Sequence, residues 1–158
     1  MSVTLWRIAT DTENYEAHDL GGKGAEKTGG RWNRPGRPVV YTSTTIALAC
    51  LETVVHLNAG SLPLNRFLVR IDVPDEVWEA RRVLDSAHLP IGWSVIPEGK
   101  VSLDIGRDWL QPGGTALLMI PSVIVHEEFN VLINPKHVDA KAITAHKARR
   151  WIYDQRLF

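Results

Sequence analysis

Three side chains that could act on a charged substrate stand close together in the chain: Arg31, Tyr41 and Glu52. Arg31 follows two glycines in a polar stretch, Tyr41 ends a short β-branched run, and Glu52 lies in a largely apolar segment. An arginine binds phosphate oxygens bidentately, an aromatic ring stacks on a planar base, and a carboxylate stabilises a developing positive charge. The combination suits a phosphate-bearing substrate that contains an aromatic base.

The segment around Glu52, residues 46–57, predicts a helix that is apolar on almost all faces. Such a helix is buried on most sides, and isolated burial of a carboxylate is costly. We therefore expect Glu52 to be paired or to face a cavity; a solvent-facing or salt-bridged structural glutamate is the alternative. His56 follows at i,i+4 spacing, which favours a structural pairing with Glu52 over a catalytic dyad.

The neighbouring candidates each have an ordinary structural interpretation as well. Gly30 lets backbone N–H groups approach a ligand and Arg31 could hold its phosphate, but an exposed loop arginine is the alternative. Tyr41 could equally be a core tyrosine with a satisfied hydroxyl. Ser122, which follows Pro121 between two apolar runs, could satisfy backbone groups at a bend, and it lacks the Gly-x-Ser-x-Gly context of an acyl-transfer serine.

The composition bounds the classes of protein to which the chain can belong. Its 158 residues fit one domain, and its eighteen basic and eighteen acidic residues cancel, whereas a protein that grips nucleic acid usually has a basic excess. We therefore expect no direct nucleic-acid binding. The single Cys50 allows no disulfide within the chain, and His126 beside two glutamates lacks the spacing of metal ligands. No apolar run approaches the ~20 residues of a membrane helix and no signal-peptide pattern begins the chain, which predicts a cytoplasmic protein.

Hydrophobic periodicity predicts a mixed α+β fold with a mostly antiparallel sheet. The expected strands are 3–8, 38–42, 66–73, 115–120, 123–126, 129–133 and the tail 141–153. The expected helices are a short piece near Tyr15, 46–57 capped by Ser43 or Thr44 and closed by Gly60, and 102–110. Most of 11–37 and all of 75–100 are expected to be irregular.

Several short motifs, taken together in their order, resemble one family. The chain carries Arg7 in the first strand, Gly-Gly-Arg-Trp-Asn at 29–33, Tyr-Thr-Ser at 41–43, Leu-Glu at 51–52, Ile-Pro-Ser at 120–122 and Asn-Pro-Lys-His at 134–137. This ordered set resembles the RES-domain toxins, named for an arginine, a glutamate and a serine that Arg31, Glu52 and Ser122 match. The similarity covers nearly the whole chain, so we expect 1–158 to form a single RES domain; only 75–100 carries no matching motif.

The resemblance implies a fold, an activity and a partner. RES proteins are toxins of type II toxin–antitoxin pairs, each neutralised by an antitoxin with an Xre-type helix-turn-helix domain. Their fold is similar to that of ADP-ribosyltransferases, a mostly antiparallel split β-sheet core with flanking helices. Their substrate is NAD⁺, which some members degrade by hydrolysis or phosphorolysis, while others transfer ADP-ribose to a protein. We expect no prosthetic group and no metal, with inorganic phosphate as a possible second substrate.

The resemblance also implies roles for individual residues. Glu52 would stabilise the oxocarbenium ion that forms when the nicotinamide–ribose bond breaks, and a single carboxylate can suffice because nicotinamide leaves as a neutral molecule. Arg31 would hold the pyrophosphate, Tyr41 would stack on nicotinamide and Ser122 would bind the ribose or carboxamide. The further NAD⁺-binding residues would be Arg7, Gly30, Trp32 and Asn134. The first alternative is a mono-ADP-ribosyltransferase and the second is a non-catalytic nucleotide-binding module. A nuclease toxin is a third and weaker alternative, because the net charge is zero and the sequence has no metal cluster or paired histidines.

Overall fold

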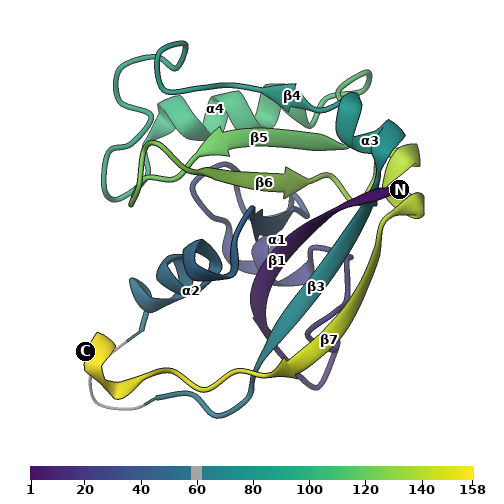
Figure 1. The fold of residues 1–158 in the computed structure, drawn as a ribbon. Helices are drawn as coiled ribbons and strands as arrows, with labels where there is room; N and C mark the ends of the chain where they lie inside the picture. The colour runs from purple at the N-terminus through teal and green to yellow at the C-terminus, as the bar shows by residue number, and fades with distance from the viewer. Residues whose placement is uncertain (58–61) are drawn as a thin grey trace.

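The computed structural model describes residues 1–57 and 62–158, and its centre is a seven-stranded sheet in the order β4-β5-β6-β2-β1-β3-β7 (Figure 1). The strands are β1 Ser2–Thr10, β2 Val40–Ser43, β3 Arg66–Pro74, β4 Arg82–Val83, β5 Leu117–Pro121, β6 Phe129–Ile133 and β7 Thr144–Arg150. The helices are α1 Lys23–Thr28, α2 Ile46–Val54, α3 Asp75–Glu79 and α4 Lys100–Trp109, with 3₁₀ turns η1 Val138–Ala142 and η2 Gln155–Leu157. All strand pairs are antiparallel except β4 with β5.

The sheet is nearly divided between β1 and β2. These two strands pair only at Trp6 and Ser43, whereas β1 and β3 pair along their whole lengths. The strands β4, β5, β6 and β2 therefore form one half, and β1, β3 and β7 form the other, which runs steeply across the view in Figure 1. The predicted α+β class with a mostly antiparallel, split sheet is confirmed.

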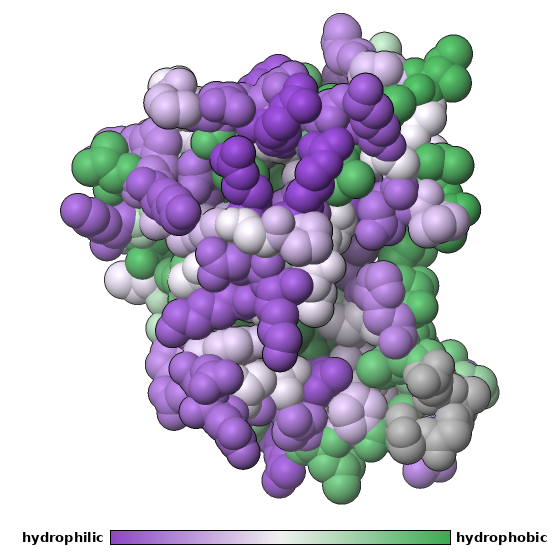
Figure 2. Space-filling view, turned by 180° about the vertical axis from the view of Figure 1, so that it is seen from behind, coloured by the Kyte–Doolittle hydropathy of each residue, from purple (hydrophilic) through white to green (hydrophobic). Residues whose placement is uncertain are grey.

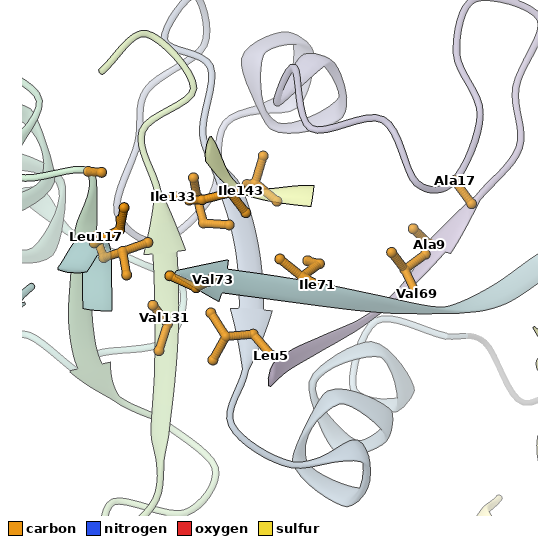
Figure 3. Close-up of a cluster of buried hydrophobic side chains, with 13 residues drawn as sticks. Leu5, Ala9, Ala17, Val69, Ile71, Val73, Leu117, Val131, Ile133 and Ile143 are labelled. Carbon is orange, nitrogen blue, oxygen red and sulfur yellow. The ribbon is translucent and has the colours of Figure 1, made fainter. Parts of the chain in front are cut away.

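The main hydrophobic core joins the two halves. Leu5 and Ile71 from one half and Val131 and Leu117 from the other belong to a single cluster, and all four side chains are completely buried (Figure 3). Burial of apolar side chains contributes roughly 1.5–3 kcal/mol each. The halves are thus held together by packing where backbone pairing is minimal.

A second cluster packs α4 against the half-sheet of β5 and β6. It contains Trp32, Trp93 and Trp109, each less than a tenth exposed. Gly106 in α4 lies so close to the 29–33 loop that an added Cβ would clash with the Trp32 carbonyl oxygen. The loop that carries Gly30 and Arg31 is therefore held in place by its close contact with α4.

The helix that carries Glu52 begins at Ile46 as predicted, but its capping residue is not one of the two predicted. Thr45 caps α2 by accepting a hydrogen bond of 3.1 Å from the Leu48 N–H. Ser43 and Thr44 cannot serve, because Ser43 is still paired in β2 and the Thr44 N–H bonds to Phe129 O. The helix ends at Val54 instead of residue 57, and Gly60 lies outside the described residues.

Two predicted elements are wrong. The chain near Tyr15 forms a turn, since the Thr12 N–H bonds to Tyr15 O, and the helix of this region is α1, which begins after Gly22 in the left-handed conformation. Residues 123–126 form no strand, because the Ser122 hydroxyl accepts the N–H groups of the two residues 124 and 125 and turns the chain.

The other predictions differ from the structure mainly in their ends. The strand predicted at 129–133 matches β6, and those predicted at 3–8, 38–42, 66–73 and 115–120 match β1, β2, β3 and β5 within a few residues. The predicted helix 102–110 matches α4, which begins two residues earlier and ends one residue earlier. The region 75–100 was expected to be irregular but contains α3 and β4. The tail 141–153 forms β7 only over Thr144–Arg150. In the described part of the chain, no helix is long and apolar enough to cross a bilayer.

The edge of the sheet at β7 is protected by charge. This strand reads Thr-Ala-His-Lys-Ala-Arg-Arg, and basic residues on an edge strand discourage pairing with another chain.

Seen from behind, the molecule presents a largely hydrophilic surface (Figure 2).

Candidate active site

A cavity of about 1070 Å³ lies where the two halves of the sheet diverge. Its walls come from β1, the 24–32 segment, β2, α2, residues 96–98 and residues 120–124. Arg7, Gly30, Arg31, Tyr41 and Glu52 all line it. Its volume is at the upper end of the range for small-molecule sites, so the cavity could hold a ligand as large as a dinucleotide.

Glu52 and Ser122 meet at this cavity. Ser122 is fully buried, and its Oγ donates a hydrogen bond of 2.7 Å to Glu52 Oε1. The same Oγ accepts hydrogen bonds from the N–H groups of Ile124, at 3.0 Å, and Val125, at 3.2 Å. Because both backbone donors point at the oxygen, the hydroxyl proton is directed to Glu52. Ser122 therefore orients the carboxylate from behind, and Ser122 is not itself among the residues of the cavity wall.

Arg7 extends from β1 into the cavity wall without an ion partner within the described residues. Its Nε atom is buried and makes no hydrogen bond. Burial lowers the pKa of Arg7, and the nearby Tyr15 and Asp19 only partly oppose that effect. A desolvated guanidinium with free donors is suited to an anionic ligand such as a phosphate.

Arg31 is anchored to the opposite wall. Its Nη1 donates to the carbonyl oxygens of Val95, at 2.8 Å, and Trp93, at 3.2 Å. The indole of Trp93 is in turn stacked on Trp32, with ring centroids 6.3 Å apart. Arg31 thus holds the segment that continues into residues 96–98 of the cavity wall.

Tyr41 is a fixed, neutral phenol. Its hydroxyl donates to Asn33 Oδ1 at 2.6 Å and accepts from the Trp32 N–H at 3.1 Å. Burial raises the pKa of Tyr41. A Cβ at Gly30 would stand only 2.8 Å from this hydroxyl, so glycine is required there for the ring to lie against the loop.

The other two predicted residues, Trp32 and Asn134, differ in their relation to the cavity. Trp32 lines it, but Trp32 is only 3% exposed and packs in the core with Trp109 of α4, so it supports the wall instead of offering an open aromatic face. Asn134 follows β6, and its Oδ1 accepts the Lys136 N–H at 3.1 Å. Asn134 does not line the cavity, and the structure does not bring it to the other candidates.

Sequence reasoning missed several residues of the cavity wall. Asn130 in β6 accepts a hydrogen bond of 2.7 Å from Ser43 Oγ, and both line the cavity with Arg66 and Glu98. His56 also lines it but makes no hydrogen bond to Glu52, so the predicted pairing is absent. A polar residue in the apolar run of β6 was the available signal for Asn130; nothing in the sequence places 96–98 at the site.

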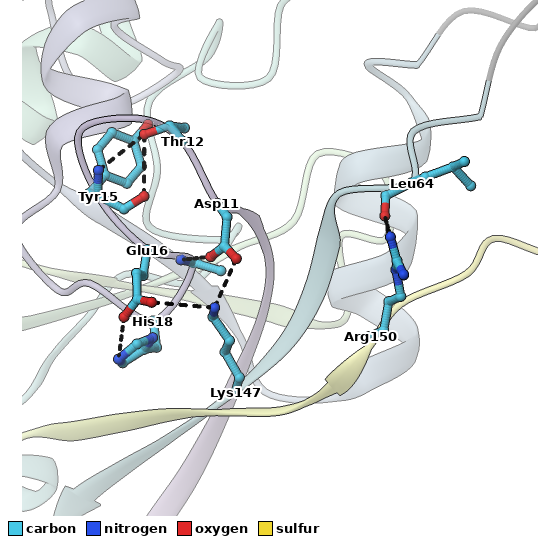
Figure 4. Close-up of polar contacts among 9 residues, drawn as sticks. Asp11, Thr12, Tyr15, Glu16, His18, Leu64, Lys147 and Arg150 are labelled. Atoms are coloured by element: carbon cyan, nitrogen blue, oxygen red, sulfur yellow. Dashed lines mark hydrogen bonds and ion pairs between the residues drawn. The ribbon is translucent and has the colours of Figure 1, made fainter.

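A polar network secures the loop after β1 (Figure 4). Lys147 Nζ lies 2.8 Å from Asp11 Oδ2 and 3.8 Å from Glu16 Oε1, and Asp11 Oδ1 accepts the Ala17 N–H. The Lys147 contact lowers the pKa of Asp11 and raises that of Lys147. The network joins the loop to β7 and so fixes Tyr15, which lines the cavity.

Over residues 1–57 and 62–158, no three His, Cys, Asp or Glu side chains are grouped to hold a metal ion.

Comparison with known proteins assigns the family. The RES domain model matches residues 4–155. The chain is 57% identical over 157 residues to the Prs ADP-ribosylating toxin of Sphingobium sp. (strain YBL2), covering 99% of this chain and 98% of the relative. It is 35% identical over 156 residues to Toxin Res of Pseudomonas putida (strain KT2440), and the match covers 98% of this chain and 99% of the relative. The crystal structure of the M. tuberculosis MbcT–MbcA toxin–antitoxin complex contains a chain of the same fold, with a TM-score of 0.63 and 15% identity over 93% of this chain and 82% of that one. The chain therefore belongs to the RES-domain family.

Proposed function

We propose that the protein is a toxin that cleaves NAD⁺ at the nicotinamide–ribose bond. The observation that carries the proposal is the Ser122–Glu52 hydrogen bond at the wall of a cavity that is also lined by Arg7, which has no ion partner among the described residues. A carboxylate held in one orientation at such a cavity suits the stabilisation of a positive charge.

The reaction follows from the placement of Glu52. When the bond between C1′ of the ribose and the nicotinamide nitrogen breaks, the electron pair leaves with nicotinamide, which becomes neutral. The positive charge is then shared by C1′ and the ring oxygen, where Glu52 stabilises it. An acceptor attacks C1′ and loses its proton. Since Oε1 is bound to Ser122, Oε2 is the oxygen available to the ribose or to the acceptor.

Arg7 and Arg31 contribute to ligand binding in different ways. Arg7 has no ion partner among the described residues and is suited to the pyrophosphate. Arg31 has two carbonyl partners, so it acts in part by holding residues 93–98 against the ligand. Its remaining N–H groups could bind the pyrophosphate or an incoming phosphate.

Transfer of ADP-ribose to a protein is the second candidate. It is favoured by the name of the 57% identical relative, the Prs ADP-ribosylating toxin. The first step would be the same, and only the acceptor would differ. NAD⁺ labelled in the ADP-ribose part separates the two: label on a protein indicates transfer, whereas free ADP-ribose or ADP-ribose 1-phosphate indicates hydrolysis or phosphorolysis.

An antitoxin is the expected partner. The resemblance points to an Xre-type helix-turn-helix antitoxin, and a protein of the same fold was crystallised in a toxin–antitoxin complex. Suppression of toxicity by a co-expressed neighbouring gene would test this partner.

Intracellular NAD⁺ after brief induction is the decisive measurement. Wild type should lower NAD⁺ rapidly, and Glu52→Gln should not, because the substitution removes the charge with little change in shape. Glu79→Gln at the exposed end of α3 is the matched control and should behave as wild type. Growth arrest with steady NAD⁺ would favour protein modification, and neither effect in wild type would reject the toxin proposal.

A further inference from the structure

We infer that Tyr153, in the segment after β7, is a positioning residue for Glu52, an inference that rests on the proposed function. Tyr153 is 3% exposed, and its hydroxyl lies 2.7 Å from Oγ1 of Thr53, the residue next to Glu52 on α2. The contact joins residues separated by 100 positions. It ties the helix that carries the carboxylate to the C-terminal segment.

The direction of this hydrogen bond follows from the partners of Thr53. The Thr53 hydroxyl donates to Cys50 O at 2.9 Å within its own helix. A hydroxyl has one proton, so the Tyr153 hydroxyl must be the donor to Thr53 Oγ1. Loss of the Tyr153 hydroxyl would remove the donor, whereas loss of the Thr53 hydroxyl would leave a buried tyrosine donor without its acceptor.

Packing holds helix α2 mainly on one side. Only Leu48 and Ala49 among its residues are buried. On one side it packs on a small cluster of four buried residues, of which Tyr153 is the largest and the others are Ile8, Ala49 and Leu68. Its other side, with Glu52 and Thr53, faces the cavity. Thr53 therefore stands where the packed side meets the cavity side.

The segment around Tyr153 is itself well supported. In Figure 1 it leaves β7 and runs below α2. The Trp151 N–H bonds to Arg66 O at 2.9 Å, and the Tyr153 ring makes edge contacts with the rings of Trp151 and Phe158, each with centroids 6.4 Å apart. Asp154 caps η2 through the Arg156 N–H. These contacts give Tyr153 a defined position from which to hold α2.

Glu52 thus has two independent supports. Ser122 orients the carboxylate group, and Tyr153 holds the helix through Thr53. The binding residues Arg7 and Tyr41 lie on β1 and β2, and within the described residues no hydrogen bond joins either side chain to Thr53 or Tyr153. Loss of the Tyr153 hydroxyl should therefore change the rate of the reaction and not the affinity for NAD⁺.

The test combines steady-state kinetics of NAD⁺ consumption with amide hydrogen exchange. Tyr153→Phe should lower kcat roughly tenfold, as expected for a small misplacement of a catalytic group, with KM within about twofold. Thr53→Val should lower kcat further, Thr53→Ser should recover most of that loss, and the double variant Tyr153→Phe/Thr53→Val should be no worse than Thr53→Val alone. Amides of α2 should exchange faster in Tyr153→Phe while those of β5 and β6 stay unchanged. Thr4→Val, which removes a hydroxyl bonded to Asp72, is the control, because neither residue lines the cavity.

The outcomes separate this inference from the proposed function. Unchanged kcat in Tyr153→Phe, or a raised KM with normal kcat, would overturn the positioning role. If wild type consumed no NAD⁺, the proposed function would fail, and the exchange experiment would still decide: unchanged exchange in α2 would overturn the tie between Tyr153 and the helix, and faster exchange would support it.

Discussion

Ser122 Oγ bonds Glu52 Oε1 at 2.7 Å while it accepts two backbone N–H groups, so one hydroxyl both closes a turn and aims a carboxylate. The two residues are 70 positions apart. The arrangement separates the two effects that a substitution of Ser122 should have, one on stability and one on turnover.

Ser122→Ala should lower kcat for NAD⁺ consumption by about 10- to 100-fold, because Glu52 loses the group that orients it. It should also lower the free energy of unfolding by about 1–3 kcal/mol, since the N–H groups of Ile124 and Val125 lose their acceptor. Turnover and denaturant unfolding measure the two effects. Ser102→Ala, at another buried serine on α4, should keep normal kcat. Normal kcat in Ser122→Ala as well would reject the orienting role.

Arg7→Met should weaken NAD⁺ binding without destabilising the fold. The substitution keeps the apolar stem but removes a buried charge that has no ion partner in the described chain, so the free energy of unfolding should stay the same or rise by about 1 kcal/mol. KM for NAD⁺ should rise at least tenfold if Arg7 binds the pyrophosphate, and Arg82→Met at the exposed strand β4 should change neither quantity. A variant that unfolds more easily and binds NAD⁺ normally would show that Arg7 serves the fold alone.

Arg31→Ala should both raise KM and loosen the segment that Arg31 holds. The carbonyl groups of Trp93 and Val95 lose their donor, so amides in 93–98 should exchange faster. Arg31→Lys separates the two roles. It keeps the charge, which would restore KM if phosphate attraction dominates, but it lacks the guanidinium Nη1 that donates to both carbonyls. Arg37→Ala, at an exposed loop position, is the control. Normal KM in Arg31→Ala would contradict a role in NAD⁺ binding.

Local features of the site were predictable from the sequence, and distant pairings were not. Alternation of apolar residues predicted β1 and β3 well, because the period of a strand is a local property. The cap of α2 was displaced to Thr45 because strand pairing extends through Ser43, and no local pattern reports pairing with β6. The same holds for the site. Arg31, Tyr41 and Glu52 were found by residue type, whereas the pairs Ser122–Glu52, Ser43–Asn130 and Thr53–Tyr153 depend on which elements meet in space.

The raised pKa of Tyr41 predicts how stability depends on pH. Burial keeps the Tyr41 hydroxyl protonated in the folded chain at pH values where the unfolded chain, with an ordinary tyrosine pKa of about 10, ionises. The folded state then binds more protons than the unfolded state, so this contribution to stability is complete below about pH 9 and declines as pH rises above about 10. The Tyr41→Phe variant has no hydroxyl at this position, so its stability lacks this pH-dependent contribution. The difference in unfolding free energy between wild type and Tyr41→Phe, about 1–3 kcal/mol at neutral pH from the bonds to Asn33 and Trp32, should therefore shrink between pH 9 and 11, by up to about 1.4 kcal/mol per pH unit. Denaturant unfolding of both proteins across this range measures the difference, and a constant value would mean that Tyr41 ionises equally in the folded and unfolded chains.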